Sequence, residues 1–274
     1  MNWHSVWAIA RKDIREVLQN KMVWAPALVV PLIFAIVFPI IMIVLPQSIP
    51  VEDVQRELGD IDSLLKNMPA ALKAIFEGKS LEQMFVIYMM GFTFAPLFLI
   101  MPLMFSSVIG SDSFAGERER KTMEALLYAP TSDLELFMGK VLAALIPAIL
   151  LSWLAFLVNI IVVNIASYPL FGEIWFPLVT WWPLIFWLTP ALAVLGISAT
   201  VLISSRVKTF MEAYQASASL VLFVLVLVIG QVSGVLFLGV AIEMIIGLFI
   251  WIVDAVLIYL SVKNFSRSSL IAKL

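Results

Sequence analysis

The sequence predicts an all-α protein that crosses a membrane several times. Of its 274 residues, 62% are hydrophobic and only 13% are charged, whereas a soluble domain carries about 25% charged residues. Several apolar runs exceed the roughly 20 residues that a helix needs to cross a hydrocarbon core. These two observations together predict a polytopic membrane protein, and each predicted element is justified below in chain order.

Residues 1–22 are predicted to form a cytoplasmic interfacial helix, because charged residues precede any apolar core and a cleaved signal is thereby excluded. Its apolar positions recur at three- and four-residue steps: Trp3, Trp7, Ala10, Ile14 and Leu18. Tryptophans beside basic residues are typical of a helix that lies in the headgroup layer. A solvated extension of the first span is the alternative.

Residues 23–274 are predicted to form one domain with six transmembrane helices. The predicted spans are Val23–Leu45, Met84–Ile109, Val141–Ile165, Trp181–Ser204, Tyr214–Val232 and Val240–Val262. An even number of spans puts both termini on one side. The segments on that side hold 13 Lys and Arg residues and the opposite segments hold 4, so we expect cytoplasmic termini and a multi-pass protein of the plasma membrane.

Three connecting segments lie between the predicted spans, and the longest of them is too small for an independent enzyme domain. Residues 46–83 are predicted to form a small extracellular helical cap, with a capping box of Ser80 and Gln83 before the second span. The aromatic residues around 166–182 are interpreted as an interfacial belt. Residues 230–239 are either a tight turn or a short re-entrant element, and their G-x-x-x-G pattern favours close helix packing, within or between subunits.

The polar segment 111–140 carries the clearest functional prediction. From Glu117 onward the sequence favours a helix, with opposite charges four residues apart: Glu117 with Lys121, and Arg120 with Glu124. We therefore expect a short amphipathic helix on the inner membrane face. A solvated connector stabilised by its own ion pairs is the alternative.

The end of this segment is predicted from turn and capping signals. Pro130 stops the helix, and Ser132 with Glu135 forms a second capping box that starts the third span. The short helix is thus held at both ends by membrane helices. An element held in this way can convert a lateral push into tilting of those helices.

The residues of this segment resemble a known family. The run from Glu117 to Pro130, followed by Ser132, Glu135 and Gly139-Lys140, resembles the cytoplasmic loop of ABC-2 type transporter permeases. The run from Ile9 to Lys21 is similar to the opening amphipathic helix of that family. Lys121 stands where a glycine commonly precedes the threonine. The resemblance extends equally to permeases of sodium efflux, drug efflux and nitrous-oxide maturation, so it does not name a cargo.

The resemblance implies that the loop is a coupling helix that contacts a separate ABC ATP-binding subunit. The implied contact residues are Glu117, Arg118, Glu119, Arg120, Lys121, Thr122 and Glu124. The implied partners are this ATPase, which would hold ATP and Mg²⁺, and a second permease, identical or related. The family and the small outer cap favour export.

The chain itself is expected to be non-catalytic and to bind no cofactor, metal or nucleic acid. A single histidine and no cysteine exclude paired-His zinc motifs and thiol catalysis. Gly78-Lys79-Ser80 ends like a P-loop, but Lys73 stands at the required earlier glycine. ATP must therefore be handled by a partner, and an intramembrane enzyme is the least favoured class.

Two acidic residues inside the last span suggest a polar pathway. Glu243 and Asp254 are eleven residues apart, close to three helical turns, so both face one side of the helix. Charges inside membrane helices usually face a cavity or a partner. We expect Asp254, Glu243 and a possible neighbour, Asn159, to line the translocation pathway; a headgroup position for Glu243 is the alternative. A secondary transporter or channel that uses the two acids is the second functional hypothesis.

Overall fold

The computed structural model describes residues 1–20, 29–45, 70–122 and 131–264, and within these ranges it is helical without strands. Five helices are long and apolar enough to cross a membrane: Leu81–Glu119, Asp133–Phe171, Trp181–Ser204, Phe210–Val232 and Val240–Lys263. The all-α fold is thereby confirmed for the described residues, and several of its helices have the length and composition to span a membrane.

The first predicted span is represented by a shorter apolar helix. It covers Val29–Val44 and consists of a first turn, η1 (Ile33–Val37) and α3 (Phe38–Val44). Residues 23–28 of that prediction lie outside the described residues. The described structure therefore supplies five long spans, and the count of six stays a prediction.

Two of the long helices form the centre of the bundle. The helix Leu81–Glu119 runs through α6 (Leu81–Val86), η3 (Ile87–Thr93), α7 (Phe94–Phe98), α8 (Ile100–Ser111), η4 (Asp112–Gly116) and α9 (Glu117–Glu119). The helix Trp181–Ser204 consists of α12 (Trp181–Pro183), η5 (Leu184–Leu188) and α13 (Thr189–Ser204). Buried residues make up 67% and 72% of their apolar windows, against 22% for each of the last two spans.

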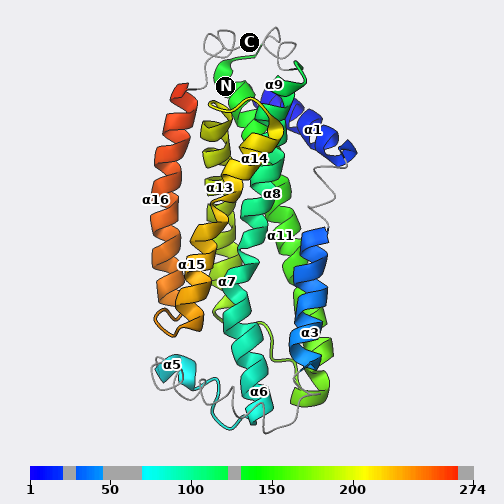
Figure 1. Ribbon diagram of the computed structural model, residues 1–274, viewed down its shortest axis with the longest axis vertical. Helices are drawn as coiled ribbons and strands as arrows, with labels where there is room; N and C mark the ends of the chain where they lie inside the picture. Colours follow the sequence, from blue (N-terminus) through cyan, green and yellow to red (C-terminus); the bar gives the residue numbers. More distant parts are fainter. Residues whose placement is uncertain (21–28, 46–69, 123–130, 265–274) are drawn as a thin grey trace.

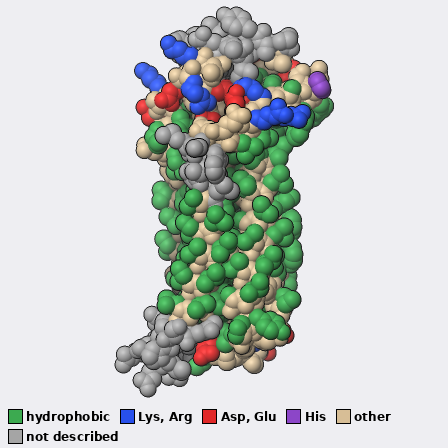
Figure 2. Space-filling view, turned by 90° about the vertical axis from the view of Figure 1, so that its right-hand side faces the viewer, with side chains coloured by type: hydrophobic (Ala, Val, Ile, Leu, Met, Phe, Trp, Pro, Cys, Tyr) green, Lys and Arg blue, Asp and Glu red, His purple; other side chains and the backbone are tan. Residues whose placement is uncertain are grey.

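The outer helices surround this centre. They are α11 (Asp133–Phe171), α14 (Phe210–Ala218), α15 (Val221–Val232) and α16 (Val240–Asn264). In Figure 1, α16 lies at one side of the bundle and α3 at the other. The sides of the bundle are covered by hydrophobic side chains, while charged side chains gather at its two ends (Figure 2). This distribution is the one that a lipid environment requires.

An aromatic cluster fills the core at the end of the bundle that carries α6, and it corrects the belt interpretation for Trp181 and Phe176, whereas Tyr168 and Trp182 are exposed. Trp181 is fully buried and packs against Phe98, Phe156 and Phe176. Its indole Nε1 donates a hydrogen bond to the carbonyl of Gly91 at 3.0 Å. Because a buried indole N–H needs an acceptor, this contact fixes the start of the fourth span against the second.

The link between the last two spans is a tight turn. The amide of Leu236 donates to the carbonyl of Gly230 at 2.9 Å, and Gly234 has a φ of 71°. Gly234 therefore lies in the turn and not on a helix, so the G-x-x-x-G pattern does not form one helical face. The re-entrant alternative is also not adopted.

The predicted extracellular cap, residues 46–83, is described only in part. A short helix, α5 (Ala70–Lys73), follows residues 46–69, which lie outside the described residues. The predicted capping box is confirmed, because the Ser80 side chain accepts a hydrogen bond from the amide of Gln83 and the Gln83 side chain accepts one from the amide of Ser80.

Most of the N-terminal segment 1–22 forms the helix α1 (Trp3–Gln19), while its predicted place at the cytoplasmic membrane surface stays a prediction. It crosses the end of the bundle that also carries α9 (Figure 1) and packs against α11. Its buried face consists of Val6, Ile9, Ala10, Asp13 and Val17. This helix places Lys12 and Asp13 beside Glu117 and Lys140, which lie on the two sides of the predicted coupling segment.

Candidate functional site

A buried lysine lies at the centre of a charged network beneath α1. Lys140, on α11, is 0% exposed. Its Nζ lies 3.3 Å from Oδ2 of Asp13, donates to the carbonyl of Ser113 at 2.7 Å and forms an ion pair with Glu117. It also lies 5.6 Å from the ring centroid of Phe114. Burying an ammonium group is costly unless opposite charges and acceptors surround it, and all of these are present here.

A second lysine covers this buried cluster from the solvent side. Nζ of Lys12 lies 2.9 Å from Glu117, 3.3 Å from Asp13 and 3.1 Å from Glu16. Partial burial on its own lowers the pKa of Lys12, but the hydrogen bond to Glu117 and the charges of Glu117 and Asp13 outweigh it and raise the pKa above the usual value. Lys12 therefore stays charged at physiological pH, and its stabilising effect is lost only when the pH rises through that raised pKa.

Three carboxylates of this network are close enough to share a cation. Oxygen atoms of Asp13, Glu16 and Glu117 lie within 4.8 Å of one another. Nζ of Lys12 is within ion-pair distance of all three. The positive charge that a bound cation would bring to this position is thus supplied by an ammonium group, and the arrangement is that of a salt-bridge network.

Two further polar contacts connect the ends of α1 to the flanks of segment 117–132. At its start, the amide of Asn2 donates to Oε1 of Glu135. At its end, Asn20 Nδ2 donates to Oδ1 of Asp112 at 3.3 Å, and the same oxygen accepts from Arg120 at 2.8 Å. Contacts at the start, middle and end of α1 therefore join this helix to both sides of the loop.

Close packing at Gly139 allows α1 to approach α11. A Cβ atom at this position would lie 2.8 Å from side-chain atoms of Ile9 and 3.0 Å from the carbonyl of Val6. Only glycine leaves room for such an approach without a shift of α1. Gly139 and Lys140 therefore both stabilise the contact between α1 and α11. Gly139 leaves room for α1, and Lys140 forms an ion pair with Asp13 of α1.

Of the first three predicted contact residues, Glu117 is buried, Arg118 is half-buried and Glu119 is exposed. Glu117 is 1% exposed, and its carboxylate forms ion pairs with Lys12 and Lys140. Arg118 is half-buried and donates to the carbonyl of Val207 at 3.2 Å. The carboxylate of Glu119 accepts from the amide of Phe210 at 2.8 Å. These contacts connect the segment to the link between the fourth and fifth spans.

The remaining contact residues lie at the surface. Arg120, Lys121 and Thr122 are exposed, and Glu124 lies outside the described residues. Thr122 donates its amide to the carbonyl of Glu117 at 2.9 Å, which closes the turn. The site residues predicted from sequence therefore separate into a buried anchor and an exposed tip.

The helix predicted from Glu117 onward is interrupted after Glu119, and residues 123–130 lie outside the described part of the chain. α9 ends at Glu119, and Lys121 adopts a left-handed conformation with a φ of 58°. The predicted pair of Glu117 with Lys121 is wrong, because Lys140 and Lys12 hold Glu117 from outside the segment. The predicted pair of Arg120 with Glu124 cannot be placed, since Glu124 is outside the described residues. The second capping box, at Ser132, is confirmed.

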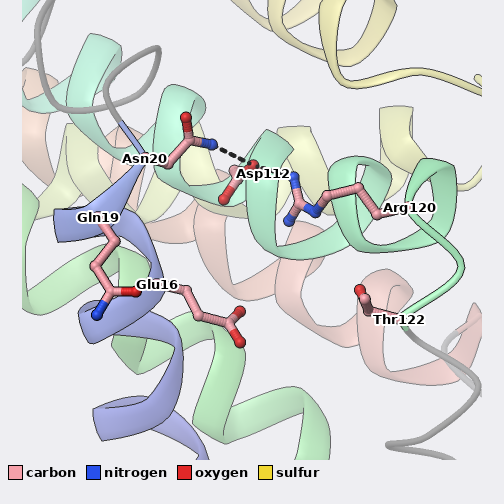
Figure 3. Close-up of a pocket in the computed structure, with 6 residues that line it drawn as sticks. All are labelled: Glu16, Gln19, Asn20, Asp112, Arg120 and Thr122. Atoms are coloured by element: carbon pink, nitrogen blue, oxygen red, sulfur yellow. Dashed lines mark hydrogen bonds and ion pairs between the residues drawn. The ribbon is translucent and has the colours of Figure 1, made fainter.

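A cavity of about 310 Å³ opens between the end of α1 and the exposed tip of the segment. It is lined by Glu16, Gln19, Asn20, Asp112, Arg120 and Thr122. Figure 3 shows that these side chains come from α1, η4 and the turn after α9, with the Asn20–Asp112 hydrogen bond at one edge. The cavity belongs to the same surface as the tip, and it offers both charges and neutral hydrogen-bonding groups.

The second predicted site, on α16, has a different character. Glu243 and Asp254 are each 1% exposed. Within the described part of the chain, neither carboxylate has a hydrogen-bond partner. The two residues share the buried face of α16 with Gly247, Ile250 and Ser261, as their spacing predicted. This face packs against α13 and η5.

Asn159 does not join the two acids through a hydrogen bond. It is fully buried on α11, and both polar atoms of its side chain lack a partner among the described residues. α13 packs against both α11 and α16. The buried polar atoms of Asn159 and those of the two acids therefore belong to different helices, α11 and α16.

Sequence reasoning missed the residues that hold the network together. Lys140 was noted only as part of a Gly-Lys pattern, and Asp13 and Asp112 were not singled out. One signal was available for Lys140, because it is a single lysine with apolar residues on both sides and no charged residue follows it before Glu173. Such a position in a membrane helix demands a partner.

Comparison with known proteins assigns the chain to a family. The model of the family described as "ABC-2 family transporter protein" matches residues 7–267, which include most of α1, the network of Lys12, Asp13, Glu117 and Lys140, and all five long spans. No curated protein and no solved structure gives a significant match. The chain therefore belongs to the ABC-2 transporter family and is a membrane permease component of an ABC transporter.

Proposed function

We propose that this chain is the permease subunit of an ATP-driven ABC-2 exporter in which segment 117–132 transmits force from a separate ATP-binding subunit. The observation that carries this proposal is the attachment of the segment. Its two ends continue into helices of 39 residues each, Leu81–Glu119 and Asp133–Phe171, and a buried network fixes both ends to α1. A push on such a segment is transmitted to two long helices together.

The rigidity of the anchor makes the transmission effective. Lys140 at the start of the third span contacts Glu117 at the end of the second. The two helices are therefore coupled below the loop as well as through it. When the ATPase subunits close on ATP, the proposed movement tilts the second and third spans as one unit and changes the side to which the pathway opens.

The proposed partner surface is the exposed tip of the segment together with its neighbouring cavity. Glu119, Arg120, Lys121 and Thr122 are exposed there, and Glu124 stays part of the proposal. Glu117 and Arg118 support the tip from within. ATP and Mg²⁺ bind to the partner, and this chain positions the helices without taking part in hydrolysis.

The rest of the proposed assembly follows from the family and the charge distribution. A second permease, identical or related, completes the translocation pathway. The chain lies in the plasma membrane with six spans, and the end that carries α1 and the coupling segment faces the cytoplasm, where most Lys and Arg residues are placed.

The test is ATP hydrolysis by the candidate ATP-binding subunit, co-purified in lipid with and without this chain. We expect a stable complex whose ATPase rate depends on the permease. Lys121→Glu should weaken the complex, because it reverses a charge at the tip and leaves a non-glycine residue in the left-handed turn. Lys208→Glu is the matched control, since Lys208 is an exposed lysine in the link that contacts Arg118 through Val207. Equal effects of the two variants would contradict the coupling role.

A second candidate function is supported by the unpartnered acids on α16. Two buried carboxylates without a partner in the described structure suit a proton- or cation-coupled secondary transporter or channel. That function requires ion flux from this chain alone in vesicles. Flux that persists without an ATPase and is abolished by Asp254→Asn would favour it over the permease.

A further inference from the structure

The helix α1 has an outer face that the charged network does not use. Three large apolar side chains on it are exposed: Trp3 at 61%, Trp7 at 54% and Leu18 at 66%. Arg11 and Arg15 are also exposed. We propose that this outer face, defined by these five residues, binds anionic phospholipids of the membrane.

Helical geometry places these residues side by side. At 3.6 residues per turn, Trp3, Trp7 and Leu18 fall within roughly 60° of the helix circumference, and Arg11 and Arg15 occupy roughly the next 60°. The buried face lies on the other side of the apolar sector. The outer face therefore presents an apolar strip bordered by a basic strip, which is the pattern of a helix that binds an anionic bilayer surface.

The basic residues of α1 are used in two different ways. Lys12 faces the network and contacts three carboxylates. Arg11 and Arg15 form no ion pair with any residue in the described ranges. Guanidinium groups bind phosphate oxygens in a bidentate manner and are weakly hydrated. These two arginines are therefore available for lipid phosphates.

The position of α1 along the bundle is that of the headgroup layer. α1 packs on α11 at Gly139, and the neighbouring Lys140 is the last charged residue of the chain before Glu173. The apolar length of α11 thus begins where α1 crosses it. In Figure 2 the charged side chains gather above the hydrophobic sides of the bundle. From this level, the tryptophans reach the acyl chains and the arginines reach the phosphates.

The experiment measures energy transfer from α1 to labelled lipids around the full chain in vesicles. Because the sequence has no cysteine, an Ala8→Cys substitution on the exposed side of α1 provides a unique position for a donor dye. The acceptor is head-labelled phosphatidylglycerol in one sample and head-labelled phosphatidylethanolamine in the other, each in phosphatidylcholine. We expect stronger transfer to phosphatidylglycerol, with a local enrichment of about fivefold for each arginine near the surface.

Two variants make the test specific. Arg11→Gln with Arg15→Gln should remove most of the enrichment, and high salt should weaken it in the unsubstituted chain. Arg206→Gln with Lys208→Gln is the matched control, because it removes two exposed basic residues from the link near α9 but leaves α1 intact. It should keep the enrichment.

Two outcomes would overturn the inference. One is equal transfer to both lipids in the chain with native Arg11 and Arg15. The other is a preference that survives the double arginine substitution. If that substitution instead abolished binding of the ATP-binding subunit without changing lipid transfer, the outer face would be a protein contact. The energy-transfer measurement itself uses no ATPase, so its outcome is independent of the proposed coupling function.

Discussion

The network beneath α1 and the packing face of α16 each bury two carboxylates, but only those beneath α1 have charged partners. Asp13 and Glu117 are held by Lys140 and Lys12. On α16, Glu243 and Asp254 have no hydrogen-bond partner among the described residues. The two carboxylates and two lysines of the network come from three separate segments of the chain. The two acids of α16 lie on one helix, which packs against the apolar fourth span.

The difference separates a structural use of buried charge from a functional one. A buried ion pair with additional hydrogen bonds fixes the geometry of the elements that supply it, and removing one partner is strongly destabilising. An unpaired polar group inside a membrane helix is costly and is commonly retained for an ion, a substrate or a second conformation. We therefore expect substitutions at the first position to change stability most, and substitutions at the second to change transport most.

The largest expected effect follows Lys140→Met. This substitution leaves Asp13 and Glu117 buried with only Lys12 to neutralise them, so we expect the free energy of unfolding to fall by about 3–5 kcal/mol. Thermal unfolding of the purified chain, followed by circular dichroism, measures the loss of stability. Limited proteolysis should at the same time show earlier release of α1.

A rescue variant and a control distinguish charge from side-chain size. Lys140→Met combined with Glu117→Gln leaves Asp13 as the one buried carboxylate of the network, paired with Lys12, and much of the stability should return. Lys208→Met changes an exposed lysine at the same end of the molecule and should have little effect. If Lys140→Met were as stable as Lys208→Met, the network would not hold the ends of segment 117–132 in place.

The second prediction concerns Asp254, a buried carboxylate of α16 without a partner among the described residues. Asp254→Val replaces a buried carboxyl group that lacks a partner with an apolar group, so the free energy of unfolding should rise by about 1–3 kcal/mol while transport falls. Ser261→Ala, on the same face, removes a hydroxyl that donates to the carbonyl of Ser198 at 3.3 Å and should lower stability slightly. A loss of stability in Asp254→Val would mean that the carboxyl group has a partner in the folded protein.

The third prediction tests the contact between α1 and α11. Gly139→Ala places a methyl group 2.8 Å from Ile9, so α1 must shift, and we expect a loss of about 1–3 kcal/mol in the free energy of unfolding. Gly239→Ala is the control, since the nearest atom to its added Cβ, from Leu72, is 3.9 Å away. Similar melting temperatures for the two variants would show that α1 does not need this close approach.

Local signals in the sequence predicted the helices well. The fourth span agrees at both ends with Trp181–Ser204, because its apolar length and its flanking turns determine its limits without reference to the rest of the fold. The capping boxes at Ser80 and Ser132 were predicted for the same reason, since they depend on residues only three positions apart.

Contacts between distant segments were beyond this reasoning. Lys140 meets Asp13 across 127 positions of the chain and Glu117 across 23. Pairing rules at helical spacing assigned Glu117 to Lys121, because they consider only neighbours on one helix. The buried lysine competes for the same carboxylate from another helix. The aromatic segment was misjudged similarly, since the sequence does not reveal that Trp181 faces the core.

The smallest expected effect concerns the edge of the network, where Lys121 has a φ of 58°. Lys121→Gly should raise the free energy of unfolding by about 1 kcal/mol, because the left-handed conformation is unfavourable for a residue with a Cβ. Lys121→Val removes the same charge but disfavours this conformation further. The difference between the two melting temperatures therefore isolates the backbone from the charge. Equal values would mean that the segment does not turn at Lys121, and its helix would then continue toward Glu124 as the sequence alone predicts.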